Sequence, residues 1–178
     1  LSKTENLFQK RNLLPYCEMP NDLSNQLVLE IGSGAGGHSA VFSRRGASVV
    51  AIDITLERAI STAQKLQLIS DNGRAYQGDS EKLPFRDSSF DIVYSNGVLH
   101  HTENTKKAIN EVHRVLKPNG KAVLMLYARH SAAFWLNIFP RGLLTGKIFK
   151  LSSYFKIIFF KLLKYKSYIF ILVLVGIL

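Results

Sequence analysis

Cysteine is nearly absent from this sequence of 178 residues, which contains Cys17 and no second one. A single cysteine cannot form an internal disulfide, and no cysteine and histidine residues recur at a metal-ligand spacing. The sequence therefore excludes a disulfide-stapled scaffold, predicts no metal site and favours a reducing, cytoplasmic setting.

Long apolar runs are absent as well. The first apolar residues stand among charged ones, so no secretion signal is recognisable, although the chain begins at Leu1 rather than methionine. The terminal run at residues 169–178 is shorter than the roughly 20 apolar residues that cross a bilayer. Extending it back to residue 157 would place three lysines at membrane depth, where each is costly. A conventional transmembrane helix is therefore disfavoured.

Acidic residues are absent from residues 141–178, which hold seven lysines and arginines. The formal net charge of the chain is +10, but residues 1–140 hold 16 basic and 13 acidic residues and contribute only about +3. A nucleic-acid-binding domain would spread its excess charge over one folded face. The basicity here belongs mostly to the tail, so we expect no nucleic-acid partner.

Apolar runs and helical patterns alternate along the chain, whose length suits one domain with a single core. The predicted strands lie at 27–31, 48–52, 74–77, 92–95 and 121–127, and the predicted helices at 37–45, 56–69 and 102–116. In the last helix Thr102 is the expected N-cap, and Pro118, Asn119 and Gly120 are expected to stop it. This alternation predicts an α/β fold, a doubly wound, mostly parallel sheet in three α/β/α layers.

Ligands of such sheets bind beyond the carboxyl ends of the strands, which directs attention to the loops there. After the first run, Gly32, Gly34 and Gly37 satisfy a G-x-G-x-x-G pattern, which by itself leaves an NAD(P) site open. Asp53 ends the second run, where a carboxylate can accept from both ribose hydroxyls. It could equally cap the following helix.

Two later segments are more specific. Gly78 to Phe85 reads GDSEKLPF, and Phe90 to His101 reads FDIVYSNGVLHH. Together with EVHRVLKPNG at Glu111 to Gly120, they resemble the serial motifs of the class I S-adenosylmethionine-dependent methyltransferases, nearest the ubiquinone/menaquinone-biosynthesis branch. An NAD(P) dehydrogenase would not explain why these segments follow the third and fourth predicted strands. The resemblance covers residues 27–127 and implies a Rossmann-like fold with S-adenosyl-L-methionine as cofactor.

The resemblance also implies roles for individual residues. The cofactor's amino acid moiety would be held by Glu30 and the glycine loop, and its ribose by Asp53. Asp79 would accept from the adenine amino group. The implied cofactor-binding residues are Glu30, Gly32, Ser33, Gly34, Gly36, Asp53, Ile54, Asp79, Ser80, Leu83, Asn96 and Val98.

Methyl transfer from a sulfonium needs mainly positioning, and an acceptor hydroxyl or phenol also needs a base. Histidine suits that role because its pKa lies near neutrality. We expect His101 to be the catalytic base, with His100 as the second candidate. Either histidine could instead pack against the cofactor or cap the following helix. The expected acceptor is a small molecule of lipid, quinone or glycan-intermediate type, methylated on oxygen or carbon.

The chain departs from the family after the fifth strand, where an antiparallel strand pair is expected and is not recognisable. We expect residues 1–140 to form the cofactor-binding domain and residues 141–178 a basic, apolar segment, helical or membrane-interfacial. Residues 147–178 could contact a membrane surface, which would make the protein peripheral. The sequence favours a truncated or frameshifted reading frame. The alternative function is a catalytically impaired, membrane-associated nucleoside-binding module.

Overall fold

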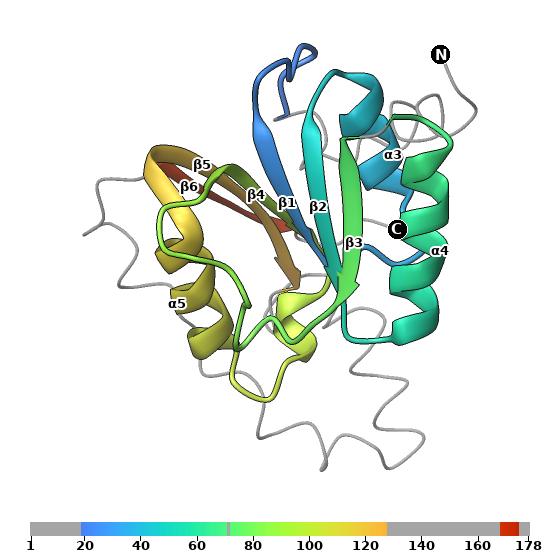
Figure 1. Ribbon diagram of the computed structural model, residues 1–178. Helices are drawn as coiled ribbons and strands as arrows, with labels where there is room; N and C mark the ends of the chain where they lie inside the picture. The colour runs from blue at the N-terminus through green and yellow to red at the C-terminus, as the bar shows by residue number, and fades with distance from the viewer. Residues whose placement is uncertain (1–18, 71, 128–167, 175–178) are drawn as a thin grey trace.

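The computed structural model describes residues 19–70 and 72–127, and the backbone of residues 168–174. Six strands form one sheet in the order β3-β2-β1-β4-β5-β6, and all neighbouring strands are parallel (Figure 1). The strands are β1 (Leu27–Ile31), β2 (Ser48–Asp53), β3 (Gly73–Gln77), β4 (Phe90–Asn96), β5 (Leu116–Tyr127) and β6 (Tyr168–Leu174). The helices are α3 (Gly37–Arg44), α4 (Leu56–Gln67) and α5 (Thr105–Val115), with a 3-10 turn, η1, at Leu99–His101. The predicted doubly wound α/β fold is confirmed.

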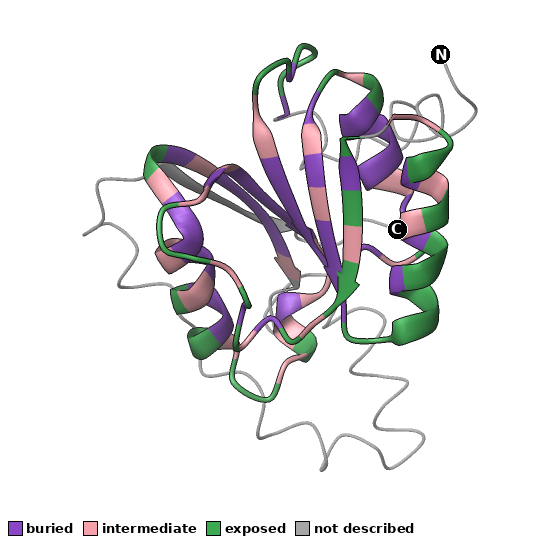
Figure 2. Cartoon of the chain, viewed as in Figure 1, coloured by how far each residue is buried: buried purple, intermediate pink, exposed green. Residues whose placement is uncertain are grey.

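Helices cover both faces of the sheet, which is why the strand sequences are almost continuously apolar. Along β1, Val28 packs in a core with α3, whereas the next residue, Leu29, packs in a core with α5. Figure 1 shows α3 and α4 on one side of the strands and α5 on the other. Figure 2 shows the central strands β1 and β4 as mostly buried and the outer faces of the helices as exposed, whereas the edge strand β3 is mostly exposed.

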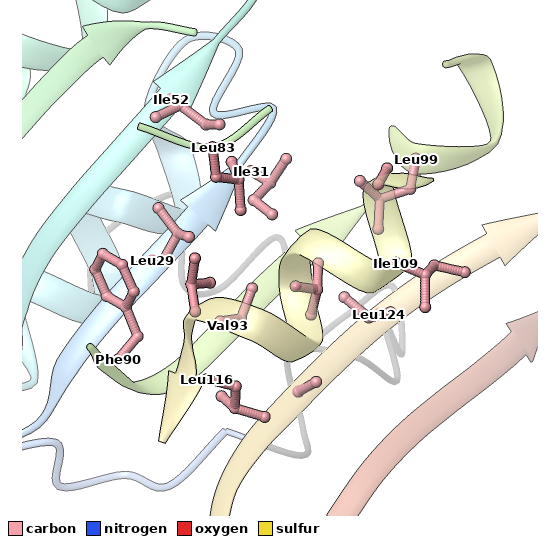
Figure 3. Close-up of a cluster of buried hydrophobic side chains, with 14 residues drawn as sticks. Leu29, Ile31, Ile52, Leu83, Phe90, Val93, Leu99, Ile109, Leu116 and Leu124 are labelled. Atoms are coloured by element: carbon pink, nitrogen blue, oxygen red, sulfur yellow. The ribbon is translucent and has the colours of Figure 1, made fainter. Parts of the chain in front are cut away.

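The core under α5 is the larger of the two apolar clusters (Figure 3). Ala108, Ile109, Val112 and Val115 form the buried face of the helix, and they meet side chains from β1, β4 and β5. Each branched side chain buried in this way contributes about 1.5–3 kcal/mol to folding. The cluster therefore anchors α5 against the half of the sheet that follows β1.

The start of α5 differs from the prediction. Asn104, not Thr102, is the N-cap, because its Oδ1 accepts a hydrogen bond of 3.0 Å from Lys107 N–H. The Thr102 hydroxyl instead donates to the carbonyl of Leu99 at 2.8 Å and closes the η1 turn. The prediction that Thr102 caps the helix is wrong because η1 inserts a separate turn that the periodicity does not reveal.

The strand β6 is not among the elements that the sequence predicts. Its residues Tyr168–Leu174 pair in parallel with Lys121–Tyr127 of β5. A continuous apolar run fits a buried parallel strand and an apolar helix equally well, so periodicity alone does not separate them. No antiparallel strand pair occurs within the described ranges. The rest of the basic segment, residues 141–167 and 175–178, lies outside the described residues, and the domain boundary at residue 140 stays a prediction.

Candidate functional site

A cavity of about 530 Å³ lies beyond the carboxyl ends of β1, β2 and β3. The strand order reverses between β1 and β4, so the loops after these two strands run to opposite sides and leave a crevice. The volume falls in the range of small-molecule sites. Its lining residues are Ile31, Gly32, Ile52, Asp53, Ile54, Thr55, Arg58, Gly78, Asp79, Ser80, Glu81, Val98, His101, Thr102 and Glu103.

The glycine loop after β1 lies close against the loop after β4. Gly32 has φ +76°, and a Cβ atom added there would lie 2.3 Å from Cγ2 of Val98. Carbon atoms that are not bonded to each other do not come that close, so glycine is required at this position for two reasons, its backbone conformation and its neighbour. The N–H groups of Gly32 and Ser33 both donate to the Ile52 carbonyl, at 2.8 and 3.1 Å, and tie the loop to β2.

Side chains of the helix α4 hold the glycine loop by hydrogen bonds. The buried Thr62 hydroxyl donates to the Gly34 carbonyl at 3.2 Å and lies 3.1 Å from the Ser33 hydroxyl. Lys65 Nζ donates to the carbonyl of Ala35. Three consecutive loop residues are therefore held by one helix.

Asp53 is buried at the end of β2 and faces the cavity. Its Oδ2 accepts from Gly34 N–H at 2.9 Å, and its Oδ1 accepts from Thr55 N–H at 3.0 Å. Two carboxylate oxygens offer about four acceptor sites, so two remain after these backbone bonds. Asp53 therefore joins the glycine loop to α4 and keeps acceptor capacity for a ligand.

The turn after β3 forms the facing wall. Asp79 lines the cavity, and its Oδ1 accepts from Glu81 N–H at 2.8 Å, which shapes the turn. Ser80, in the same turn, is buried. The sequence predicts that Asp53 and Asp79 bind different parts of one ligand. Both residues border the same cavity.

The 3-10 turn η1 carries the two histidines. His101 is exposed and lines the cavity, whereas His100 is partly buried and is not among the lining residues. The two rings lie 4.0 Å apart between centroids. Burial, and then the charge of His101, lower the pKa of His100 to about 4. His100 is therefore neutral at neutral pH, and His101 is the better placed of the two candidate bases.

Some of the predicted residues are not among those that line the cavity. Glu30 is only 1% exposed, and its carboxylate accepts from the Ser39 hydroxyl and lies 3.4 Å from Nδ1 of His38, both on α3. Leu83 packs in the core beside Ile31 and Ile52, whose side chains line the cavity (Figure 3). Half of the predicted set lines the cavity, namely Gly32, Asp53, Ile54, Asp79, Ser80, Val98 and His101. The predicted residues that do not line the cavity are His100, Glu30, Ser33, Gly34, Gly36, Leu83 and Asn96.

Sequence reasoning missed several lining residues, chiefly Arg58, Glu81 and Glu103. Arg58 lies in the first turn of α4, which begins three residues after β2 ends. A helix that begins so close to a strand end brings its first turn over the same edge of the sheet, and that signal could have identified Arg58. Glu81 and Glu103 lie in loops, where no periodicity indicates direction.

The cavity lining carries more acidic than basic side chains. Its lining includes four carboxylates, Asp53, Asp79, Glu81 and Glu103, against the guanidinium of Arg58. Such a site favours a ligand that carries positive charge. Within the described ranges there is no cluster of His, Cys, Asp or Glu residues that could hold a metal ion, and no helix long and apolar enough to cross a membrane.

Comparisons with known proteins agree on one family. A family model described as a methyltransferase domain matches residues 29–124, more than half of the chain. An uncharacterized methyltransferase of Bacillus subtilis, YcgJ, is 41% identical over 101 residues, which cover 55% of this chain and 39% of that protein. Superposition on the solved structure of YcgJ gives a TM-score of 0.51 at 33% sequence identity. The superposed region covers 66% of this chain and 47% of the solved chain.

Two further similarities extend the comparison. The ubiquinone/menaquinone biosynthesis C-methyltransferase UbiE of Pectobacterium atrosepticum is 33% identical over 110 residues, covering 59% of this chain and 44% of that protein. A solved protein of Bacillus halodurans C-125 has a TM-score of 0.59 with 24% identity, covering 84% of this chain and 61% of the solved one, and it supports the fold alone. The matched region spans less than half of each of the two curated relatives, YcgJ and UbiE.

Proposed function

Because this chain belongs to the methyltransferase domain family, we propose that it is a class I methyltransferase that transfers a methyl group to a small-molecule acceptor. S-adenosyl-L-methionine is the cofactor of this family. One observation carries the proposal: the glycine loop, Asp53 and Asp79 border the same cavity at the edge of the sheet where its strand order reverses.

The cavity fits this cofactor in charge and shape. A sulfonium and an ammonium give the cofactor two positive charges against one carboxylate, which suits a lining with more carboxylates than cations. Asp53 keeps acceptor sites for two ribose hydroxyls. Asn96 Oδ1 is a buried acceptor with no hydrogen-bond partner in the described part of the chain, so a donor from a ligand would satisfy it.

The remaining roles are those that the resemblance implies, with Arg58 added because it lines the cavity. Asp79 would accept from the adenine amino group, and Ser80 would lie beside the ring. Ile54 is 72% exposed at the rim of the cavity, and a flat apolar ring laid on it would remove that surface from water. Arg58 would pair with the cofactor's carboxylate. Val98 lines the cavity and would lie near the sulfonium, whereas Asn96, expected beside it, is not among the lining residues.

When bound there, the cofactor would supply a methyl group attached to a positively charged sulfur, and the sulfur would become a neutral thioether once the methyl group is transferred. The chain contributes orientation, since the glycine loop and both aspartates hold one ligand from opposite walls. His101 would accept the acceptor's proton at a ring nitrogen. His100, whose pKa burial lowers to about 4, stays neutral beside it.

The acceptor class is the finer part of the proposal. We infer a small aromatic or quinone-like acceptor, because the chain resembles UbiE and because a phenolic proton is the kind that a neutral histidine can remove. Incubation with methyl-labelled cofactor and a panel of quinol head groups, glycans and nucleic acids tests it. Label transfer confined to glycans or nucleic acids would contradict this acceptor class.

Calorimetric titration with S-adenosylmethionine and S-adenosylhomocysteine tests the proposed cofactor. The whole chain is expected to bind both, and Asp53→Asn to weaken binding by about tenfold or more, since an amide loses charge and one set of acceptor sites. Asp91→Asn is the matched control. Asp91 also accepts from a backbone N–H, that of Leu27 at 2.9 Å, but it lies at the opposite ends of the strands. Absent binding of both nucleosides by a folded preparation would defeat the proposal.

A further inference from the structure

The long loop between β3 and β4 forms one wall of the cavity without belonging to a helix or strand. Its first part, Gly78 to Glu81, lines the cavity, and the rest runs alongside α5 (Figure 1). Loops of this kind have no ladder of backbone hydrogen bonds to fix their shape. What holds residues 79–87, here named the wall loop, therefore decides where Asp79 and Ser80 lie.

Two side chains of α5 hold the wall loop by its backbone. Glu111 Oε2 accepts from Leu83 N–H at 2.8 Å. Arg114 donates to the carbonyls of Leu83 and Phe85, at 2.9 and 2.7 Å. The two residues are one turn apart on the helix and form a clamp around residues 83–85.

The guanidinium of Arg114 is fully used. Nε and Nη2 bond Glu111 at 2.8 and 2.7 Å, Nη1 also bonds Asp87 at 2.8 Å, and with the two carbonyls this accounts for all five N–H donors. The Glu111 bonds lower the pKa of its carboxyl group and raise that of Arg114, so both groups stay charged near neutral pH. Lysine has three donors and no planar fork, so it could not replace this set.

A second contact holds the other end of the same loop. Glu81 Oε1 accepts from the backbone N–H of Asn104 at 2.6 Å, just before α5 begins. Glu81 Oε2 also lies 3.9 Å from Nζ of Lys107 on the first turn of the helix. The loop is thus fixed to α5 on both sides of Lys82, and Asp79 and Ser80 extend from the fixed part toward the cavity.

We propose that Glu111 and Arg114 are positioning residues for the nucleoside end of the cofactor, holding the wall loop so that Asp79 and Ser80 face the cavity. The inference rests on the proposed function. The competing explanation is that the clamp only joins α5 to the sheet, in which case its loss would lower stability without a selective effect on the ligand.

The ion pair between Lys117 and Asp91 gives a matched control. Lys117 Nζ lies 2.8 Å from Asp91 Oδ1, and its side chain is 42% exposed, against 30% for Arg114. Lys117 lies just after α5 at the amino end of β5, whereas the cavity lies beyond the carboxyl ends of the strands. Arg114→Met removes the ion pairs with Glu111 and Asp87, and Lys117→Met removes the ion pair with Asp91 beside the same helix. Only the first contacts the wall loop.

A double-mutant cycle on the whole chain separates the two explanations. The dissociation constant of S-adenosylhomocysteine is measured for the wild type, Asp79→Asn, Arg114→Met, Lys117→Met and the two double variants. We expect Arg114→Met to weaken binding about tenfold in the wild type and less than about threefold in the Asp79→Asn background, because the contact that the clamp positions is already impaired. Lys117→Met should lower the melting temperature and leave the dissociation constant within about twofold in both backgrounds.

Equal factors for Arg114→Met in both backgrounds, or equal effects of Arg114→Met and Lys117→Met on affinity, would overturn the proposal. If Arg114→Met does not fold, Glu111→Gln takes its place, since it nearly preserves volume while it removes the charge and one of the two accepting oxygens that hold Leu83 N–H and Arg114. Hydrogen exchange of the amides of Glu81 and Leu83 gives a readout without ligand, and it should accelerate about tenfold in Arg114→Met and not in Lys117→Met. A wild type that binds no cofactor would defeat the proposed function, and unchanged exchange would defeat the clamp separately.

Discussion

At the scale of single residues, the site depends on side chains that serve the fold and the ligand together. Asp53 accepts two backbone N–H groups and still has acceptor sites toward the cavity. Gly32 allows both the turn and the close approach of Val98. A substitution at either position would change the shape of the glycine loop as well as its contacts, so a loss of binding there needs a stability measurement beside it.

His100 makes stability depend on pH. Its pKa is about 4 in the folded chain, below the ordinary value of 6.5, because burial disfavours the charged ring. Between these two values the unfolded chain binds more protons, so this contribution is complete above pH 6.5 and is lost as the pH falls toward 4. His100→Gln should therefore flatten the fall in melting temperature over that window. Parallel curves for the wild type and the variant would contradict the prediction.

At the scale of elements, α4 and α5 each support one wall of the cavity. The helix α4 holds the glycine loop through Thr62 and Lys65, and α5 holds the wall loop through Glu111 and Arg114. Neither support is visible as an apolar pattern, because each runs through hydrogen bonds to loop carbonyls and N–H groups. The strands determine where the loops begin, and the helices determine their shape.

Thr62→Val tests the support by α4. The change keeps the shape of the side chain but leaves the Gly34 carbonyl without the Thr62 hydroxyl, at a cost of about 1–3 kcal/mol. We expect lower stability in urea unfolding and weaker cofactor binding. The control is Ser43→Ala, which breaks a 2.9 Å hydroxyl pair with Ser70 beyond the other end of α4. Equal losses of affinity in the two variants would show that Thr62 acts only through general stability.

At the scale of the whole molecule, charge is divided between the tail and the site. The chain has a formal charge of +10, yet the cavity lining holds four carboxylates and one guanidinium. A ligand with net positive charge is attracted to such a lining even though the molecule as a whole is basic. We therefore expect the local field at the site, rather than the net charge, to govern which nucleoside binds.

Salt should therefore affect the two nucleosides differently. S-adenosylmethionine carries one net positive charge and S-adenosylhomocysteine none, so raising the ionic strength should weaken binding of the first by about threefold and change the second little. Calorimetric titration of both at low and high salt measures the difference, with S-adenosylhomocysteine as the internal control. The same salt dependence for both ligands would show that the carboxylates do not act on the sulfonium.

Much of the fold and part of the site could be predicted from the sequence. Apolar runs located β1 to β5, although β5 begins at Leu116 rather than at residue 121, and the motifs at Asp53 and Asp79 indicated the two walls of the cavity. Arg58, Glu81 and the α5 clamp were not predicted as parts of the site, because the direction of a side chain in a loop or a first helical turn depends on contacts far away in the sequence. The strand β6 was not predicted because its apolar run also fits a helix.

The sequence by itself determined the alternation of strands and helices, because burial on both faces of a sheet imposes continuous apolar runs, and it determined which loops carry polar residues. Only the tertiary structure decided which of those residues share a cavity. Glu30 ends up held by α3 and His101 at the cavity edge, although both belong to the matched motifs. The physical reason is that hydrogen bonds between distant segments, such as those from Arg114 to Leu83 and Phe85, determine loop shape after the core has formed.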